Sequence, residues 1–228
     1  MRPIAIFFHC LFGFGPPFKP LPSAIPIIDE QMRALRDSGL LDAATEMYVG
    51  INGGEESAGL ADTVIPSKAT RIFHGLESRA ENLTIVELHN WAKSHPDWSV
   101  LYFHSKGATH DPGSSYGENV SKPWRHGMMA DLVTNWHRCV PALETDIDIV
   151  CSHWMWRMAD GTQHIPAGNF LWIKSNFAAK LPSMFLRERI KISGIASAES
   201  RFEAEVFWGN GRRPIVKQFR PNGGGGVP

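Results

Sequence analysis

The chain has 228 residues, of which 43% are hydrophobic and 20% are charged. This composition is typical of a folded globular protein and excludes a disordered or coiled-coil chain. Lys and Arg total 23, as do Asp and Glu, so no net positive charge favours nucleic acid or an anionic membrane as a partner. No apolar run approaches the roughly 18 residues of a membrane span.

The N-terminal apolar run superficially resembles a weak signal peptide. However, His9 interrupts it and two prolines end it, so a first buried strand is the better interpretation. The three cysteines lack the CxxC spacing of zinc or redox sites. Their odd number and wide spacing favour a reducing environment, and we expect a cytoplasmic protein.

Apolar runs rich in β-branched and aromatic residues alternate with helical patterns along the chain. The runs predict buried strands at 4–9, 47–51, 71–73, 99–104, 147–151 and 169–173. Spacings of three to four residues between apolar side chains predict helices over 26–38, 82–94 and 121–144. Asn82, or else Thr84, is expected to cap the second helix. The alternation predicts an α/β fold whose mostly parallel sheet is flanked by helices and binds ligands at the carboxyl ends of its strands.

The segment SVLYFHSKGATHD is the most informative, because an apolar strand ends abruptly in polar residues. Lys106 supplies a point charge, Ser105 a hydroxyl, and Gly107 lets a ligand approach the backbone closely. Together with His104 they suit a phosphate or a diphosphate. The alternative is an ordinary strand exit with a solvated lysine.

Two further segments suit carbohydrate recognition. In HIPAGNFLW, His164, Gly168 and Asn169 precede an apolar run, so that the Asn169 amide is a candidate to orient sugar hydroxyls and Trp172 to stack on a sugar ring. The alternative is a turn followed by a core strand. In RFEAEVFWG, Glu203 and Glu205 face different directions on a short helix, so at most one is expected to reach a cleft. A solvated acidic face is the alternative there.

Taken in order, four segments resemble bacterial glycosyltransferase-like proteins of the GT-A fold, related to the rhamnan synthesis F proteins. The segments are HSKG (104–107), PWRHGMM (123–129), HIPAGNFLW (164–172) and RFEAEVFWG (201–209). The resemblance implies a GT-A-like nucleotide-diphospho-sugar transferase fold. We expect one domain over 1–220, with the nucleotide in the 1–100 half, the diphosphate and acceptor in the 101–220 half, and a flexible tail at 221–228.

One departure from the GT-A pattern concerns the metal. Such enzymes usually carry an Asp-x-Asp element after the strand that corresponds to 99–104, whereas this chain has His104, Ser105 and Lys106 there. The Lys106 cation is therefore expected to neutralise the leaving diphosphate in place of a metal, and no cofactor is expected to be required. A Mn²⁺ or Mg²⁺ ion held by His110 and Asp111 is the alternative.

The resulting hypothesis is transfer of a sugar from a nucleotide-diphosphate sugar to a hydroxyl of a glycan or polysaccharide. The predicted donor-binding residues are His9, Asn52, His104, Ser105 and Lys106. The predicted acceptor-binding residues are His164, Gly168, Asn169, Trp172 and Trp208. Glu205 is the predicted general base, with Glu203 second. Alternatives are a hydrolase or phosphotransferase acting on phosphorylated sugars, and a catalytically silent carbohydrate-binding or scaffold domain.

Overall fold

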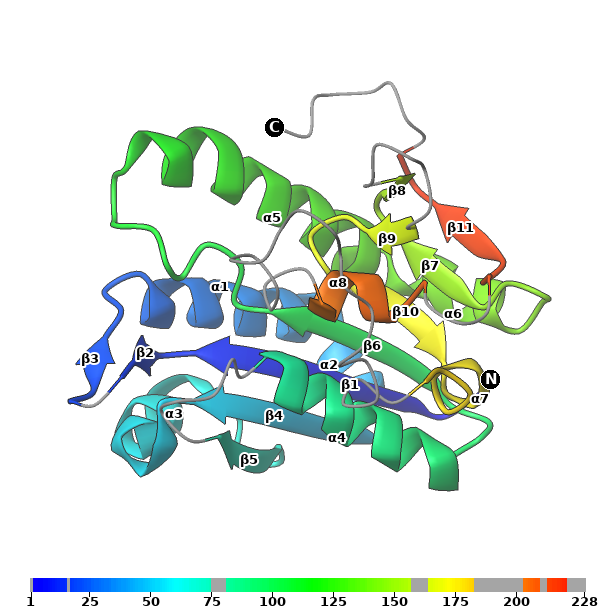
Figure 1. Cartoon of the computed structure of the whole chain (residues 1–228), viewed down its shortest axis with the longest axis horizontal. Helices are drawn as coiled ribbons and strands as arrows, with labels where there is room; N and C mark the ends of the chain where they lie inside the picture. The colour runs from blue at the N-terminus through cyan, green and yellow to red at the C-terminus, as the bar shows by residue number, and fades with distance from the viewer. Residues whose placement is uncertain are drawn as a thin grey trace.

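A central sheet covered by helices on both faces forms the core of the computed structural model (Figure 1). The structure describes residues 2–15, 17–74, 81–156, 164–182, 203–209 and 213–220. The seven strands of the sheet are β1 (Ile4–Leu11), β4 (Glu46–Asn52), β5 (Thr70–His74), β6 (Ser99–His104), β7 (Ile149–Cys151), β10 (Leu171–Lys174) and β11 (Val216–Gln218). Two short hairpins pair β2 (Gly13–Phe14) with β3 (Lys19–Pro20), and β8 (Trp154–Trp156) with β9 (His164–Pro166).

The strands follow the order β11-β7-β10-β6-β1-β4-β5. All neighbours are parallel except β10, which runs antiparallel to both β6 and β7. The predicted α/β fold, with a mostly parallel sheet flanked by helices, is thereby confirmed. Each of the six strands expected from the sequence lies in this sheet. The strand expected to be buried at 71–73 is instead the edge strand β5, where Phe73 is 42% exposed. The register sets His9 of β1 beside His104 of β6, so the polar strand ends meet at one edge.

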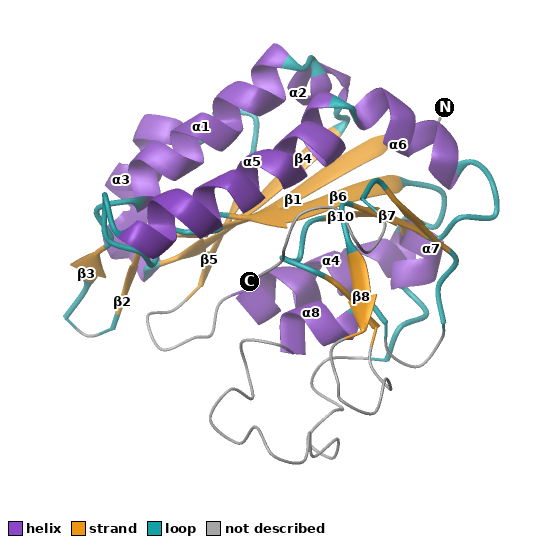
Figure 2. Cartoon of the chain, turned by 90° about the horizontal axis from the view of Figure 1, so that it is seen from above, coloured by secondary structure: helices purple, strands orange, loops and turns teal. Residues whose placement is uncertain are grey.

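The helices divide between the two faces of the sheet, as Figure 2 shows from above. One face carries α1 (Ala24–Asp37), α2 (Leu40–Ala43), α3 (Ala58–Val64), α5 (Lys122–Met129) and α6 (Trp136–Leu143). The other carries α4 (Glu81–Ser94), α7 (Ser175–Ala178) and α8 (Glu203–Phe207). Because side chains alternate along a strand, each strand feeds both layers: in β1, Phe8 packs under α1 while Phe7 packs under α4.

Two details of the expected helices differ. The pattern at 121–144 forms α5 and α6, which are joined through the π-helical segment Ala130–Thr134 instead of one continuous α-helix. The expected cap at Asn82 or Thr84 is wrong, because α4 already begins at Glu81. The Thr84 hydroxyl is instead buried and hydrogen-bonded to two histidines.

The three cysteines, Cys10, Cys139 and Cys151, are free and buried. Burial raises the pKa of each thiol, so none is set up as a reactive thiolate. Within the described ranges, no helix combines the length and apolar character needed to span a bilayer. The tail expected at 221–228 lies outside the described residues.

Candidate functional site

A cavity of about 320 Å³ opens at the carboxyl ends of β1 and β6. This carboxyl-edge cavity brings together six residues predicted as site residues from the sequence: His9, His104, Ser105, Lys106, Asn169 and Glu205. They come from both predicted halves of the chain and from β1, β6, the loop after β6, the turn before β10, and α8 (Figure 1). The cavity is at the edge where parallel α/β sheets bind ligands, and its volume is at the lower end of the range for ligand sites.

The loop that carries Lys106 is fixed at several points. The Ser105 hydroxyl accepts a hydrogen bond from the Leu11 N–H at 2.9 Å, which ties the loop to the end of β1. Gly107 has a φ of +95°, and a Cβ there would lie 2.8 Å from Ser121 Oγ. Only glycine fits both the backbone conformation and this close approach. The Lys106 ammonium lies 3.9 Å from the centre of the Trp124 ring, within range of a cation–π interaction.

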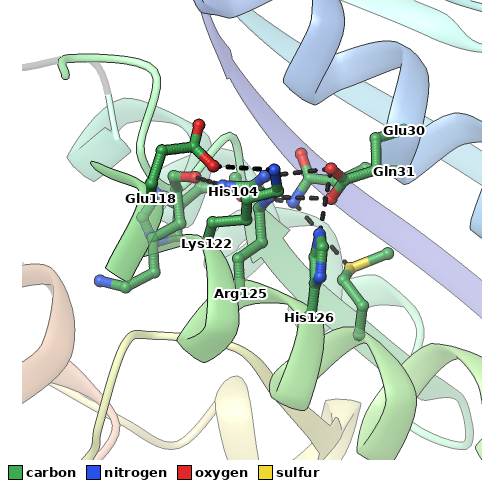
Figure 3. Close-up of polar contacts among 9 residues, drawn as sticks. Glu30, Gln31, His104, Glu118, Lys122, Arg125 and His126 are labelled. Atoms are coloured by element: carbon green, nitrogen blue, oxygen red, sulfur yellow. Dashed lines mark hydrogen bonds and ion pairs between the residues drawn. The ribbon is translucent and has the colours of Figure 1, made fainter. Parts of the chain in front are cut away.

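Arg125 of α5 also holds the loop that carries Lys106. It is 4% exposed, and it donates from Nε and Nη2 to the two oxygens of Glu30 at 2.9 and 3.0 Å. Its third bond, from Nη1 to the Lys106 carbonyl, measures 3.0 Å. His126 lies 3.2 Å from the same Glu30 carboxylate, as Figure 3 shows. Burial alone would raise the pKa of Glu30, but the bonds and charges of Arg125 and His126 outweigh burial and lower it. The Glu30 carboxylate is therefore ionised at pH 7 and forms a two-pronged, charge-assisted pair with Arg125.

Beneath the cavity, the Thr84 hydroxyl bridges two imidazoles. His9 Nδ1 and His74 Nε2 each lie 3.0 Å from Thr84 Oγ1. A Cβ at Gly50 would collide with that hydroxyl, so glycine is what lets α4 come this close to β4. Burial, followed by the charges of His74 and His104, holds the pKa of His9 well below 6.5, and burial lowers the pKa of His74 to about 4. Both rings are therefore neutral at pH 7, which leaves His9 as an uncharged hydrogen-bonding group in the cavity.

Asn169 is held in a conformation that few residues adopt. It has a φ of +58° and follows Gly168 at +82°. Its Nδ2 donates to Glu81 Oε1 at 2.6 Å, and its Oδ1 accepts from Trp208 Nε1 at 2.5 Å. The two partners fix which way the amide points. Non-glycine residues at positive φ are costly and cluster at functional sites, so the backbone of this turn, as well as its sequence, makes Asn169 a candidate site residue.

The other predicted site residues lie elsewhere. Asn52 is buried at the end of β4 and does not line the cavity. Trp172 is fully buried under the helical layer and donates to the Leu132 carbonyl at 2.7 Å, so it is not positioned to stack on a sugar. Trp208 is equally buried and acts on the site through Asn169.

Gly168 contributes backbone, because its carbonyl lies 3.0 Å from His104 Nε2. A carbonyl only accepts, so that nitrogen of His104 carries the proton. His164 and Glu203 lie on β9 and at the start of α8, but their side chains are outside the described residues.

Sequence reasoning missed Glu81, which lines the cavity from the first turn of α4. The position of Glu81 in the sequence could have indicated this place. A helix that follows a parallel strand starts at the edge where α/β sheets bind ligands, and Glu81 is an acidic residue at such a helix start. Trp124, from the PWRHGMM segment, also lines the cavity.

The strand end after β6 does not carry the acidic pair that usually holds a divalent metal in GT-A enzymes. The place of the Asp-x-Asp element is occupied by His104, Ser105 and Lys106, and a lysine ammonium only donates. In the described part of the chain, no three His, Cys, Asp or Glu side chains are grouped as metal ligands would be.

Fold and cavity together define an α/β protein with a candidate ligand site at the carboxyl edge of its sheet. The chain belongs to the family described as a domain of unknown function, DUF8361, whose model matches residues 16–202. No curated protein matches the sequence. The finer resemblance to rhamnan synthesis F proteins stays a prediction.

Several solved structures are similar to this chain at low sequence identity. HddC from Yersinia pseudotuberculosis is 10% identical, with 97% of this chain and 91% of that chain covered and a TM-score of 0.49. A 4-diphosphocytidyl-2C-methyl-D-erythritol synthase from Anaerococcus prevotii is 10% identical over 95% and 87% of the two chains, with a TM-score of 0.45. A CMP:2-keto-3-deoxy-manno-octonic acid synthetase complexed with CTP is 8% identical over 67% and 53%, with a TM-score of 0.37. At these scores none of the three carries an activity over to this chain.

Proposed function

We propose that the protein is a glycosyltransferase that moves a sugar from a nucleotide-diphosphate sugar to a hydroxyl of a glycan or polysaccharide. One observation carries the proposal: a cation, Lys106, and a carboxylate, Glu205, line the same cavity at the carboxyl edge of a parallel sheet. Glycosyl transfer needs both, because negative charge develops on the leaving diphosphate while a proton leaves the attacking hydroxyl.

In the proposed reaction, the acceptor oxygen forms a bond to the anomeric carbon as the bond from that carbon to the diphosphate oxygen breaks. The diphosphate leaves with the electron pair, and the Lys106 ammonium neutralises its charge. Glu205 accepts the proton of the acceptor hydroxyl, with Glu203 as the second candidate. Ser105 and Gly107 support the position of the diphosphate because they fix the backbone around Lys106.

The proposal includes a cytoplasmic location, which agrees with three buried free thiols. It also includes independence from divalent metal. Turnover is expected to continue in excess EDTA, since Lys106 stands where metal-binding carboxylates would. Complete loss of turnover that Mn²⁺ restores would refute this part, and His110 and Asp111 would then be tested as metal ligands.

A thermal-shift screen tests the function as a whole. A ligand that binds only the folded state stabilises it by about 2.7 kcal/mol at a hundredfold excess over its dissociation constant. We expect stabilisation by nucleotide-diphosphate sugars and, more weakly, by nucleoside diphosphates. Product analysis with a bound donor then separates transfer to a glycan from hydrolysis or phosphotransfer. Binding of free sugars without any nucleotide binding would indicate a silent carbohydrate-binding domain instead.

A further inference from the structure

Glu81 is the second described carboxylate in the carboxyl-edge cavity, and no role has been given to it above. It is the first residue of α4, and its side chain is 26% exposed. The helix start places its negative charge where the helix dipole favours it. An ionised carboxylate that is largely withdrawn from water needs hydrogen-bond donors.

One oxygen of this carboxylate is anchored by neighbouring strands and turns. Glu81 Oε1 accepts from Asn169 Nδ2 at 2.6 Å and from the Tyr102 hydroxyl at 3.2 Å, and His104 Nε2 lies 3.9 Å away. Burial, and then the Glu81 charge, raises the pKa of Tyr102 well above 10, so its hydroxyl stays protonated and donates. The Asn169 amide cannot turn over, because Trp208 donates to its oxygen.

The other oxygen, Oε2, receives no hydrogen bond and no ion pair from any residue that the structure describes. A carboxylate offers about four acceptor positions, and the three contacts above all fall on Oε1. As far as the described part of the chain shows, Oε2 can therefore accept a hydrogen bond from a ligand in the cavity that Glu81 lines. A phosphate would be repelled there, whereas a hydroxyl would donate to it.

We propose that Glu81 is a binding residue for the sugar of the ligand, whose hydroxyl donates to Oε2. This inference rests on the proposed function and refines it. Lys106 is assigned to the diphosphate, and Glu81 to the sugar attached to it. The ligand class is a hydroxyl-bearing sugar joined to a nucleoside diphosphate. A nucleoside diphosphate without the sugar does not use this contact.

The substitution Glu81→Gln tests the contact with little change of shape. Asn169 and Tyr102 both donate, so they hold the glutamine carbonyl oxygen in the place of Oε1. The amide nitrogen then occupies the place of Oε2 and presents a donor where the wild type presents an acceptor. Glu87→Gln removes the same charge from an exposed position on the same helix and is the matched control.

Calorimetric titrations would compare wild type and both variants with UDP-glucose, UDP-galactose, GDP-mannose and dTDP-rhamnose, and with UDP, GDP and dTDP. Hydrogen bonds to charged groups are strong enough that we expect Glu81→Gln to weaken sugar-nucleotide binding at least about tenfold. Its affinity for the matching diphosphate should stay within about twofold of wild type. Glu87→Gln should leave both affinities unchanged.

The outcomes separate the two proposals. Unchanged sugar-nucleotide affinity in Glu81→Gln, or an equal loss for the bare diphosphate, overturns the Glu81 assignment while the proposed function stands. Failure of the wild type to bind any sugar nucleotide of the panel overturns the proposed function, and the Glu81 assignment with it. Thermal unfolding checks that the variant is folded. Should Glu81→Gln not fold, Glu81→Asp, which keeps the charge but withdraws it by one methylene, is judged by the same ratio of affinities.

Discussion

Lys106 and Arg125 are joined through the backbone of the lysine: Arg125 Nη1 donates to the Lys106 carbonyl at 3.0 Å. The residue before the arginine, Trp124, lies under the Lys106 ammonium at 3.9 Å from its ring centre. Two consecutive residues of α5 therefore hold both ends of the lysine that faces the cavity. The WR pair (Trp124 and Arg125) and the HSK element (His104 to Lys106), which both belong to the family resemblance, are thus in direct contact.

Lys106→Ala is expected to weaken nucleoside-diphosphate binding about tenfold or more, because charge-assisted hydrogen bonds contribute about 1.5–3 kcal/mol. Trp124→Leu should weaken it only a few fold, since a partly exposed cation–π contact contributes about 0.5–1 kcal/mol. Titration of UDP, GDP and dTDP, alongside the bare nucleosides, measures both effects. Equal diphosphate affinities in wild type and Lys106→Ala would show that Lys106 does not bind the diphosphate.

The Arg125–Glu30 pair gives a prediction about stability. Glu30→Ala leaves a guanidinium that is 4% exposed without its carboxylate. Because the Glu30 side chain is itself 33% exposed, we expect a loss below the about 3–5 kcal/mol of a fully buried pair. The double variant Glu30→Leu with Arg125→Met should be less destabilised than Glu30→Ala, because it leaves no buried charge. Urea denaturation at pH 7 measures all three proteins.

The Lys122–Glu118 pair on the neighbouring turn provides the control. Its side chains are 45% and 50% exposed. Lys122→Ala is therefore expected to change the free energy of unfolding by only about 0.5 kcal/mol. A loss for Glu30→Ala no larger than that for Lys122→Ala would show that the buried pair does not stabilise the loop.

The fold could be predicted from the sequence because its signals are local. The apolar runs that became strands of the sheet are short and rich in β-branched and aromatic residues. Ile28, Met32 and Leu35, at helical spacing, are all fully buried in α1. The site could be predicted where polar residues follow a strand directly, as at His104, Ser105 and Lys106.

Contacts between distant segments could not be predicted. Trp172 and Asn169 lie three residues apart, yet one is in the core and the other lines the cavity, because β10 begins between them and turns Trp172 toward the helical layer. Glu81 is held in the site by hydrogen bonds from Asn169 and Tyr102, which are 88 and 21 residues away along the chain. No periodicity within one segment contains that information.

Because His74 is buried, the free energy of unfolding is expected to depend on pH. The pKa of His74 is about 4 in the folded protein because of burial, and near 6.5 when unfolded. The unfolded chain thus binds more protons between these values, so this histidine makes stability fall as pH drops from about 6.5 to about 4. The slope reaches about 1.4 kcal/mol per pH unit, and the total is about 3 kcal/mol. Above pH 7 the contribution is constant.

His74→Gln should keep a hydrogen bond to Thr84 and remove this part of the pH dependence. Urea denaturation at pH 7, 6 and 5 measures it, with the exposed residue His137 replaced by Gln as the control. The curves of wild type and His74→Gln should differ more at pH 5 than at pH 7, while His137→Gln should follow the wild type. Parallel curves for wild type and His74→Gln would contradict a buried, neutral His74.

The assignment of the base starts from chemistry: a sugar hydroxyl is a poor nucleophile unless its proton is removed as the bond to the anomeric carbon forms. Glu205 lines the cavity from α8, between Ala204 and the buried pair Phe207 and Trp208, so its backbone is held by packing. A positioned general base contributes about 10²–10⁴-fold in rate. Glu205→Gln keeps the shape and loses the base.

We therefore expect turnover of Glu205→Gln to fall at least about a hundredfold, while donor affinity and melting temperature hardly change. Glu87→Gln, which removes a carboxylate from the exposed face of α4, should keep full turnover. Initial rates at saturating donor, together with donor titration, separate the chemical step from binding. If Glu205 only forms an ion pair at the surface, its loss costs about 0.3–0.5 kcal/mol and leaves the rate near normal. Near-normal turnover would contradict the assignment. Glu203→Gln would then be measured in the same way, since Glu203 as the base predicts the hundredfold loss there instead.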